Sequence, residues 1–203
     1  DQRHVPYEIA NAEHLAMSDS TGMINLSHFA IMDIKGKDAE RMLEYLSVAK
    51  VGSDTPEGRM IYTNFLDEDG GVHADLTISR LGVDSYRVVT GGADGNRDWV
   101  TMRNYRDDTG LDADINIRTH DIATLGLWGP KAKNALGHFI DPSEISIDNF
   151  PFVTAKYLTL NLSGGKKIDV WAARISYVGE SGWELYLNND SEDGLALYDS
   201  LLE

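Results

Sequence analysis

Two short stretches bring a tyrosine and a carboxylate close together in patterns typical of hairpins. The first runs from Tyr62 to Asp75 across the turn DEDGG, and the second is YVGESGWELY, which contains Tyr177 and Glu184. A carboxylate accepts hydrogen bonds from a planar donor edge and stabilises nearby positive charge. The two stretches therefore indicate one or two sheet faces suited to a flat, hydrogen-bonding ligand. A solvated polar face is the alternative explanation for either pair alone.

The pairing in the first hairpin depends on the location of its turn. A tip at 68–69 sets Tyr62 directly opposite Asp75, whereas a tip at 69–70 sets Tyr62 opposite Thr77 with Asp75 diagonal to it. In both registers the tyrosine and the aspartate share one face of the sheet, because alternate residues of a strand point the same way. Apolar residues then occupy the other face.

The second hairpin follows the same logic. A tip at 180–181 sets Tyr177 directly opposite Glu184 across an antiparallel pair. Each hairpin is thus expected to hold a tyrosine beside a carboxylate on one sheet face.

Strands and helices that could position these residues are visible along the whole chain. Period-two alternation at 60–91 predicts a three-stranded antiparallel meander. Further strands are predicted at 22–34, 122–128, 155–162, 167–177 and 183–189, and helices at 37–46, 95–106, 131–140 and 191–203. Antiparallel groups of strands with helices between them favour an α+β fold, with antiparallel sheets and flanking helices.

The helix predictions include caps and buried faces. Asp38 and Ser191 are expected as N-caps, since short polar side chains accept hydrogen bonds from the first free amides of a helix. Trp99 and Met102 are expected on the buried side of the predicted helix 95–106. In the last helix the predicted apolar face consists of Leu195, Tyr198, Leu201 and Leu202.

Composition limits the classes of function. At 203 residues the chain is long enough for one large or two small domains, and its formal net charge of −15 argues against nucleic-acid binding. We expect no membrane span, because no run of 18 apolar residues occurs, and no secretory signal at the N-terminus. The chain lacks cysteine, and its six histidines never pair at metal-binding spacing, so we expect no metal site and a cytoplasmic location.

The stretch RISYVGESGWELY resembles the signature of the glycine-cleavage T-protein (aminomethyltransferase) family. Three other segments are similar to that family too: GMINLSHFAIMDIKGKDAERMLEYL, IYTNFLDEDGGVHADLTISRLGVDSYRVVT and LGLWGPKAKNAL. Within this family, the sequence SYVGESGWELY and the LWGP strand look closer to the folate-binding halves of dimethylglycine and sarcosine dehydrogenases than to the stand-alone T-protein. The resemblance covers nearly the whole chain.

The resemblance implies a tetrahydrofolate cofactor, a one-carbon cargo and a three-lobed ring with folate in its middle. Asp75 would be the catalytic carboxylate, stabilising the iminium-like cation of the transfer. Glu184 would accept hydrogen bonds from the aminopyrimidine edge of the pterin. The other implied cofactor-binding residues are Tyr62, Thr77, Val89, Thr90 and Tyr177. The expected reaction forms 5,10-methylene-tetrahydrofolate from an N-methylated amine or aminomethyl donor.

The same resemblance sets the expected organisation. A folate-binding domain would span 1–203 and contain the first two lobes of the family fold, with a central meander lobe at about 32–117 inserted between 1–31 and 118–203. The family's C-terminal barrel is absent, so we expect a fragment of a longer protein. Where the T-protein has two adjacent aspartates, this chain has Ala74 and Asp75.

Partners and alternative functions are also implied. FAD is expected only if a separate flavin domain exists in the parent protein; that domain or a lipoyl carrier protein would be the macromolecular partner. One alternative is a folate-dependent demethylase acting on a sulfur or oxygen methyl donor. Another is a folate-binding or assembly module without catalysis.

Overall fold

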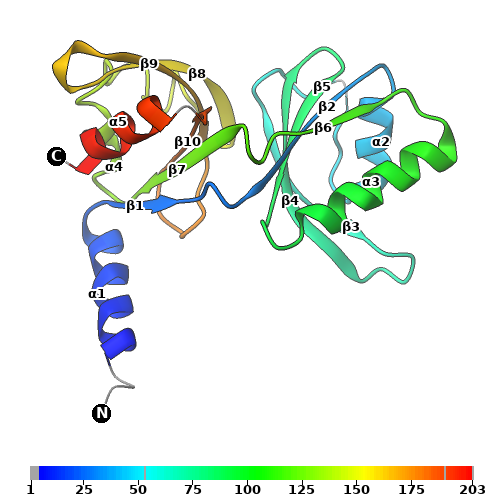
Figure 1. The fold of residues 1–203 in the computed structure, drawn as a ribbon, viewed down its shortest axis with the longest axis horizontal. Coiled ribbons are helices and arrows are strands. Elements are labelled where there is room, and N and C mark those ends of the chain that lie inside the picture. The colour runs from blue at the N-terminus through cyan, green and yellow to red at the C-terminus, as the bar shows by residue number, and fades with distance from the viewer. Residues whose placement is uncertain (1–4, 53, 190, 203) are drawn as a thin grey trace. The chain divides into compact units, whose positions relative to one another are not determined.

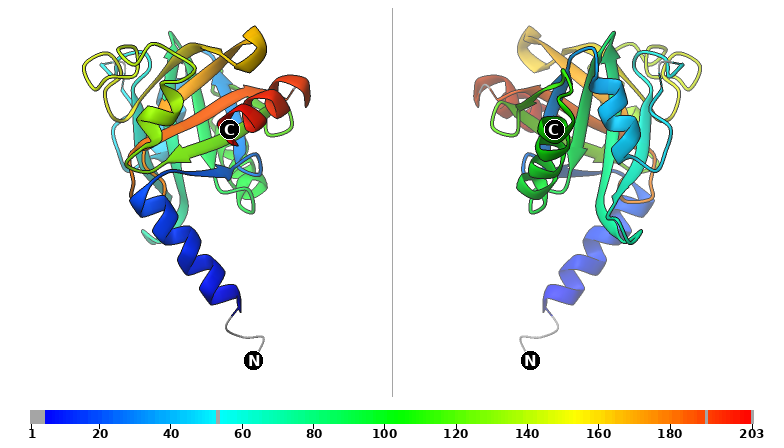
Figure 2. Two further views of the ribbon diagram at one scale, coloured as in Figure 1. Left: turned by 90° about the vertical axis from the view of Figure 1, so that its left-hand side faces the viewer. Right: turned by 90° about the vertical axis from the view of Figure 1, so that its right-hand side faces the viewer.

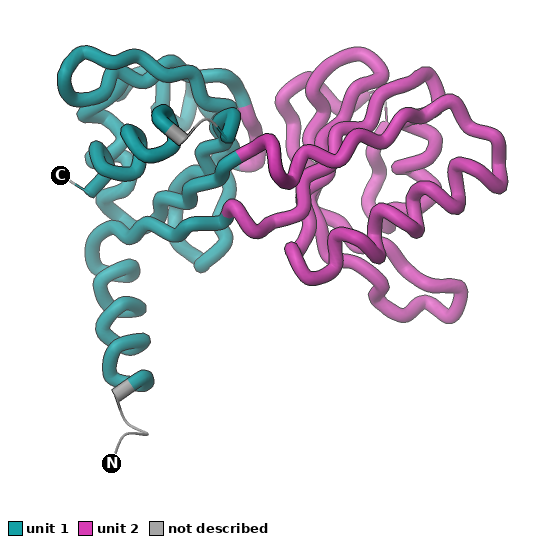
Figure 3. The backbone as a smooth tube through the Cα atoms, in the orientation of Figure 1, with its two compact units in different colours: residues 1–26, 123–152, 156–203 teal, residues 27–122, 153–155 magenta. Residues whose placement is uncertain are grey.

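The computed structural model describes residues 5–52, 54–189 and 191–202, which form two compact units. Unit 1 contains residues 1–26, 123–152 and 156–203, and unit 2 contains residues 27–122 and 153–155 (Figure 3). Each unit is built around one five-stranded antiparallel sheet. The expected α+β class with antiparallel sheets and flanking helices is therefore confirmed.

Unit 2 holds the meander. Its strands are arranged in the order β3 (Met60–Leu66), β4 (Val72–Gly82), β5 (Ser85–Thr90), β2 (Ala30–Lys35) and β6 (Asp114–Ile117). Its helices are α2 (Ala39–Leu46) and α3 (Gly95–Thr109) (Figure 1). The three consecutive strands β3, β4 and β5 pair as predicted from the period-two alternation.

The two faces of this sheet differ in chemistry. Ala74, Leu76 and Ile78 of β4 are buried in one apolar cluster with Met42 of α2 and Met102 of α3. Side chains alternate along a strand, so the intervening residues of β4 point to the face away from these helices. The second face lies outside this cluster: Asp75 of β4 is exposed there, whereas Val89 of β5 is buried.

Unit 1 has the strand order β1 (Gly22–Asn25), β7 (Ile122–Trp128), β10 (Gly182–Asn188), β9 (Lys167–Arg174) and β8 (Thr154–Asn161). Its helical segments are α1 (Val5–Asp19), α4 (Ala132–Leu136), the 3-10 turn η1 (Ser163–Gly165) and α5 (Ser191–Leu202). Leu136 of α4 and Leu197 of α5 pack with Trp183 and Leu185 of β10 to form the core of this unit.

Several expected elements differ in detail from the observed ones. The single strand predicted at 22–34 is two strands, β1 and β2, separated by a turn at residues 26–29. Asp38 precedes α2, but its side chain makes no capping bond to that helix. Its carboxylate accepts a hydrogen bond from the Asp112 amide at 2.9 Å instead, so Asp38 connects α2 to the segment after α3.

The final helix buries a different face from the predicted one. Leu197 is fully buried, whereas Leu195 and Tyr198 are 61% and 40% exposed, and only Leu201 of the predicted face packs against the core. Leucines occur on more than one side of this helix, so tertiary packing decides which of them are buried. Ser191 begins α5, but its capping side chain lies outside the described residues.

Helix α1 was not predicted from the sequence. Figure 2 shows it extending away from the rest of its unit, and its apolar residues Tyr7, Ile9 and Leu15 are at least half exposed. Among the described residues, no helix is both long and apolar enough to cross a membrane.

Candidate functional site

Asp75 and Tyr62 lie on the face of the unit 2 sheet that points away from its helices. Tyr62 is opposite Thr77 and Asn64 is opposite Asp75, which is the register with the turn tip at 69–70. Tyr62 is therefore diagonal to Asp75, and its hydroxyl donates a hydrogen bond to Asp75 Oδ2. Both side chains are exposed, so a carboxylate oriented by a phenol is accessible on this face.

The Tyr62 hydroxyl remains a donor over the physiological pH range. Its hydrogen bond to Asp75, and the negative charge of that carboxylate, raise the pKa of Tyr62 above its ordinary value. Because the phenol keeps its proton, the Asp75 carboxylate keeps one fixed hydrogen bond and has acceptor capacity left over.

Two more of the expected residues share this face. Thr77 of β4 pairs with Val89 of β5, and Val89 in turn pairs with Ile31 of β2. These pairs form a row that begins at Tyr62 and becomes apolar toward the middle of the sheet, where Val89 is 7% exposed. This face thus combines an exposed charged group with a flat apolar strip that is buried toward the middle of the sheet.

Thr90 lies on the opposite face, although it follows Val89 directly. Its hydroxyl donates to Asp98 Oδ2 of α3 at 2.7 Å and lies 3.3 Å from the backbone oxygen of Asp75. Asp98 is fully buried, and its other oxygen accepts from the Arg97 guanidinium at 3.2 Å. Asp98 was not identified from the sequence as a partner of Thr90. The only local signal for such a role is that Asp98 is an acidic residue in the first turn of a helix that follows a strand.

Glu184 occupies a different setting in unit 1. It lies on β10 opposite Ala173 and is only 5% exposed. The Tyr186 hydroxyl, two residues along the same strand and therefore on the same face, donates to Glu184 Oε2 at 2.5 Å. No donor among the described residues bonds to Oε1. Burial raises the pKa of Glu184 to about 7, and the Tyr186 hydrogen bond opposes that shift.

The predicted cross-strand pairing of Tyr177 with Glu184 is wrong. Strand β9 ends at Arg174 and β10 begins at Gly182, so Tyr177 lies within the intervening loop. The loop is held against β7: Trp128 Nε1 donates to the Ile175 carbonyl at 2.8 Å, and the Trp128 and Tyr177 ring centroids are 5.9 Å apart. A short hairpin turn was assumed, whereas the loop spans residues 175–181.

Close packing explains the glycine that begins β10, directly after this loop. A Cβ on Gly182 would lie 2.0 Å from the backbone oxygen of Leu127, so no side chain fits between β10 and β7 there. The loop also carries Gly179 at φ +90°, a conformation that L side chains rarely adopt. The glycines of YVGESGWELY therefore have structural roles that residue spacing alone did not reveal.

Arg174, part of the same signature, serves the fold. Its guanidinium lies 5.1 Å from the centre of the Trp183 ring, and its NH1 group donates to the Phe150 carbonyl at 2.7 Å. Trp183 belongs to the core face of β10, the face away from Glu184. Arg174 thus anchors the segment before β8 to the core of unit 1.

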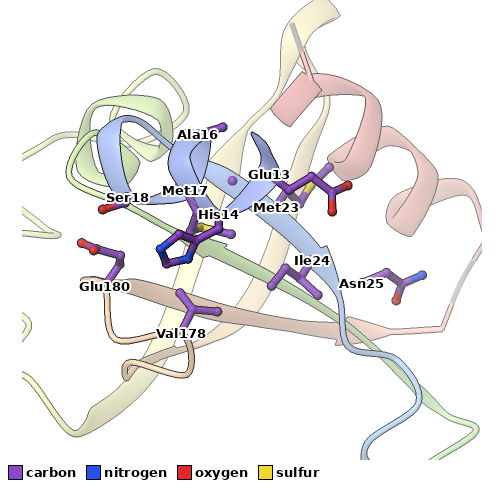
Figure 4. Close-up of a pocket in the computed structure, with 11 residues that line it drawn as sticks. Glu13, His14, Ala16, Met17, Ser18, Met23, Ile24, Asn25, Val178 and Glu180 are labelled. Atoms are coloured by element: carbon purple, nitrogen blue, oxygen red, sulfur yellow. The ribbon is translucent and has the colours of Figure 1, made fainter. Parts of the chain in front are cut away.

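A cavity of about 660 Å³ in unit 1 contains none of the expected site residues (Figure 4). It lies between α1, β1 and the loop before β10, with His14 and Met17 on the helix, Ile24 on the strand and Val178 and Glu180 on the loop. In the part of the chain that the structure describes, no three histidine or acidic side chains are grouped as metal ligands.

Residues 2–203 match the family model described as the GCVT N-terminal domain. The chain belongs to this family. The resemblance to the glycine-cleavage T-protein family is thereby confirmed. Human mitochondrial dimethylglycine dehydrogenase is 31% identical over 199 residues, which cover 97% of this chain and 21% of that protein. An aminomethyltransferase from Alkaliphilus oremlandii is 27% identical over 199 residues, covering 98% of this chain and 51% of the relative.

Solved structures agree on the fold of this GCVT domain. The glycine cleavage system aminomethyltransferase T from Bartonella henselae has a TM-score of 0.77 at 21% identity, covering 94% of this chain and 48% of that one. The heterotetrameric sarcosine oxidase from Corynebacterium sp. U-96, in complex with pyrrole 2-carboxylate, gives 0.61 at 14% identity, with 96% and 92% covered. The chain spans about half the length of the curated aminomethyltransferase.

Proposed function

We propose that this GCVT domain serves tetrahydrofolate-dependent one-carbon transfer, with Asp75 as the catalytic carboxylate. The observation that carries the proposal is the exposed Asp75 carboxylate, oriented by the Tyr62 hydroxyl on the sheet face away from the helices. Family membership supplies the reaction class, and the local geometry supplies a fixed negative charge beside a flat strip. The donor we favour is an N-methylated amine or an aminomethyl group.

In unit 1, the side chain of Glu184 has the properties needed to bind the pterin edge of a folate. Glu184 is a buried acceptor whose Oε1 receives no hydrogen bond from the described residues, and its Oε2 receives one, from Tyr186. A buried carboxylate with unused acceptor capacity is costly unless a donor arrives. The aminopyrimidine edge of a pterin presents parallel donors of the required kind. We therefore assign Glu184 to recognition of that edge and Asp75 to the transfer itself.

When bound, tetrahydrofolate supplies the nitrogens that accept the one-carbon group. Positive charge develops on the donor side during such a transfer, and a preoriented carboxylate stabilises it. Tyr62 keeps the Asp75 carboxylate in one orientation, so little reorganisation is needed when that charge appears. Thr77 and Val89 contribute the polar edge and the apolar surface next to it, and Thr90 contributes only backbone, since its side chain is directed to Asp98.

Replacing the carboxylate tests this assignment directly. In the full-length protein, Asp75→Asn is expected to lower the turnover number for one-carbon transfer by about 10²–10³, equivalent to about 2.7–4 kcal/mol of barrier. The amide keeps the size of the side chain, so the melting temperature should stay close to the wild type. The measurement is formation of 5,10-methylene-tetrahydrofolate from dimethylglycine, sarcosine or an aminomethylated lipoyl carrier.

Asp114→Asn is the matched control, because Asp114 is an exposed aspartate on the same sheet whose side chain has no partner among the described residues. Normal turnover in Asp75→Asn would refute the role of Asp75. Methylated sulfur and phenolic donors are assayed in parallel; activity with those donors alone would identify a demethylase instead. If the protein binds folate but turns over none of these donors, it is a folate-binding module without catalysis. A flavin domain with FAD, or a lipoyl carrier protein, would then not be needed as a partner.

A further inference from the structure

A second cavity in unit 1, of about 480 Å³, lies on the helix side of the sheet. It is bordered by α4, by the end of α5 and by the turns that carry Thr21 and Ser163. Leu136 and Leu197 of these two helices pack in the core against Trp183, whose side chain points away from Glu184. The cavity is therefore separated by the sheet from the residues assigned to folate.

One face of α4 supplies donors to this cavity. Lys131, Asn134, Ala135 and His138 all border it, and they follow the i, i+3, i+4, i+7 spacing of a single helical face. The Gly137 amide donates to the Lys133 carbonyl at 2.9 Å, so the helical turn continues to His138. This face is polar and carries one fixed positive charge.

The cavity is lined by positive charge, whereas the chain as a whole is strongly negative. The protein contains 33 acidic and 18 basic residues, yet no acidic residue borders this cavity. Lys131 forms no ion pair with any carboxylate of the described residues, although most of the chain's carboxylates are exposed. An unpaired lysine beside an amide and an imidazole favours an anion over a cation or a neutral apolar ligand.

Ser200 gives the independent indication that a ligand belongs here. It is 9% exposed and borders the cavity, but its hydroxyl makes no hydrogen bond to any described residue. The Thr21 hydroxyl at the cavity wall is buried and has no partner within the described chain either. Buried hydroxyls are satisfied in most proteins, because an unmade hydrogen bond costs free energy. Ser200 is thus a largely buried donor at the border of the cavity, and no described residue provides an acceptor for it.

We propose that this cavity binds a phosphate group through Lys131, Asn134 and Ser200. A phosphate presents several acceptor oxygens around one centre, which matches an ammonium and an amide NH2 from the α4 segment and a hydroxyl from α5. Inorganic phosphate and a phosphate ester share this chemistry, and the cavity has room for a phosphate carried on a larger molecule. The site is separate from one-carbon transfer, so it stands whether or not the proposed function does.

Titration of the full-length protein with inorganic phosphate and with glycerol 3-phosphate tests the proposal, with chloride at equal ionic strength as the reference. Binding is followed by calorimetry and by the rise in melting temperature that a ligand of the folded state produces. We expect saturable binding, and Lys131→Gln should weaken it about tenfold, as expected for a lost charged hydrogen bond. Tighter binding of the ester would identify a phosphorylated metabolite, and tighter binding of inorganic phosphate the free ion.

The control is Lys133→Gln, on the same helix but outside the cavity. It removes the same charge and should leave affinity unchanged. Ser200→Ala should weaken binding several-fold without lowering the melting temperature, since it deletes a hydroxyl that has no partner in the protein. The proposal is overturned if binding does not saturate, if Lys133→Gln weakens it as much as Lys131→Gln, or if Ser200→Ala binds like the wild type.

Discussion

The two carboxylates assigned to function differ in how their own unit surrounds them. Asp75 is exposed on a sheet face and receives a hydrogen bond from a tyrosine on the neighbouring strand. Glu184 is buried and receives one from a tyrosine on its own strand. A tyrosine thus orients the carboxylate in both units, but only Glu184 is removed from solvent.

The difference separates two kinds of chemistry. An accessible carboxylate with a fixed orientation suits stabilisation of charge that develops during a reaction. A buried carboxylate with unused acceptor capacity suits recognition, because a ligand that donates to it removes a desolvation penalty. Under the proposed function, the same pair of residue types serves transfer in one unit and ligand selection in the other.

After the loss of turnover in Asp75→Asn, the largest expected effect is that of Glu184→Gln on the pH dependence of the free energy of unfolding. Burial favours the protonated form of Glu184 in the folded state, with a pKa of about 7 against 4.5 for the ordinary value. The raised pKa of Glu184 therefore adds to the free energy of unfolding at low pH. This stabilisation is fully present below pH 4.5 and is lost as the pH rises through about 7, which lowers the free energy of unfolding by about 3 kcal/mol. Glu184→Gln cannot ionise, so its free energy of unfolding should lose this pH dependence.

Urea unfolding of wild type and Glu184→Gln between pH 5 and 8 measures the effect. Glu68→Gln, at the exposed tip of the β3–β4 hairpin, controls for the loss of one carboxyl group. Parallel stability curves for wild type and Glu184→Gln would show that Glu184 is not enclosed as described.

Folate affinity should distinguish the two carboxylates next. Glu184→Gln is expected to weaken tetrahydrofolate binding by about 1–3 kcal/mol, because a buried charged acceptor is replaced by a group that also carries donors. Asp75→Asn should change affinity less than turnover, since the role proposed for Asp75 is in the transfer. Fluorescence titration of both variants provides the comparison; equal affinity of Glu184→Gln and wild type would remove Glu184 from the site.

Tyr62→Phe tests the accessible pair. Loss of one hydrogen bond to Asp75 is expected to cost about 1 kcal/mol in the transfer barrier, or roughly fivefold in turnover. Stability should hardly change, because Tyr62 is 60% exposed. A loss as large as that of Asp75→Asn would mean that the phenol acts in the reaction itself.

Tyr186→Phe should have the smallest effect, which is a shift in the pKa of Glu184 without loss of function. The Tyr186 hydrogen bond lowers the pKa of Glu184, so its removal should raise that pKa further and move the pH-dependent loss of stability to higher pH. Carbon-13 NMR of the Glu184 carboxyl reports the titration. A downward shift of the Glu184 pKa would show that the Tyr186 hydrogen bond does not favour the ionised carboxylate.

Much of unit 2 was predictable because its local signals agree with one another. The alternation at 60–91 and the glycine-containing turn DEDGG fixed the meander, and both considered registers set Tyr62 and Asp75 on one face. A strand pattern with a short turn leaves few alternatives, since a slip of one residue would expose the core side chains. Thr90 was expected in the site together with Val89, but the contact of its side chain with Asp98 depends on a helix whose packing the sequence does not specify.

Unit 1 was harder to predict for physical reasons. The pairing of Tyr177 with Glu184 assumed a short turn, whereas contacts with Trp128 stabilise a longer loop. The buried face of α5 was misjudged because its leucines lie on several sides, and only packing against the sheet selects Leu197. The Tyr186 donor was missed for a simpler reason: it lies on the same strand as Glu184, and only pairs across hairpins were considered.

Burial of Glu184 has a thermodynamic consequence for ligand recognition. Near neutral pH this carboxyl is a mixture of protonated and ionised forms, since its pKa is about 7. A ligand that donates hydrogen bonds to it favours the ionised form, so association must release protons to the solvent. The calorimetric enthalpy of binding would then vary with the ionisation enthalpy of the buffer, and the apparent dissociation constant would fall as the solution becomes more alkaline.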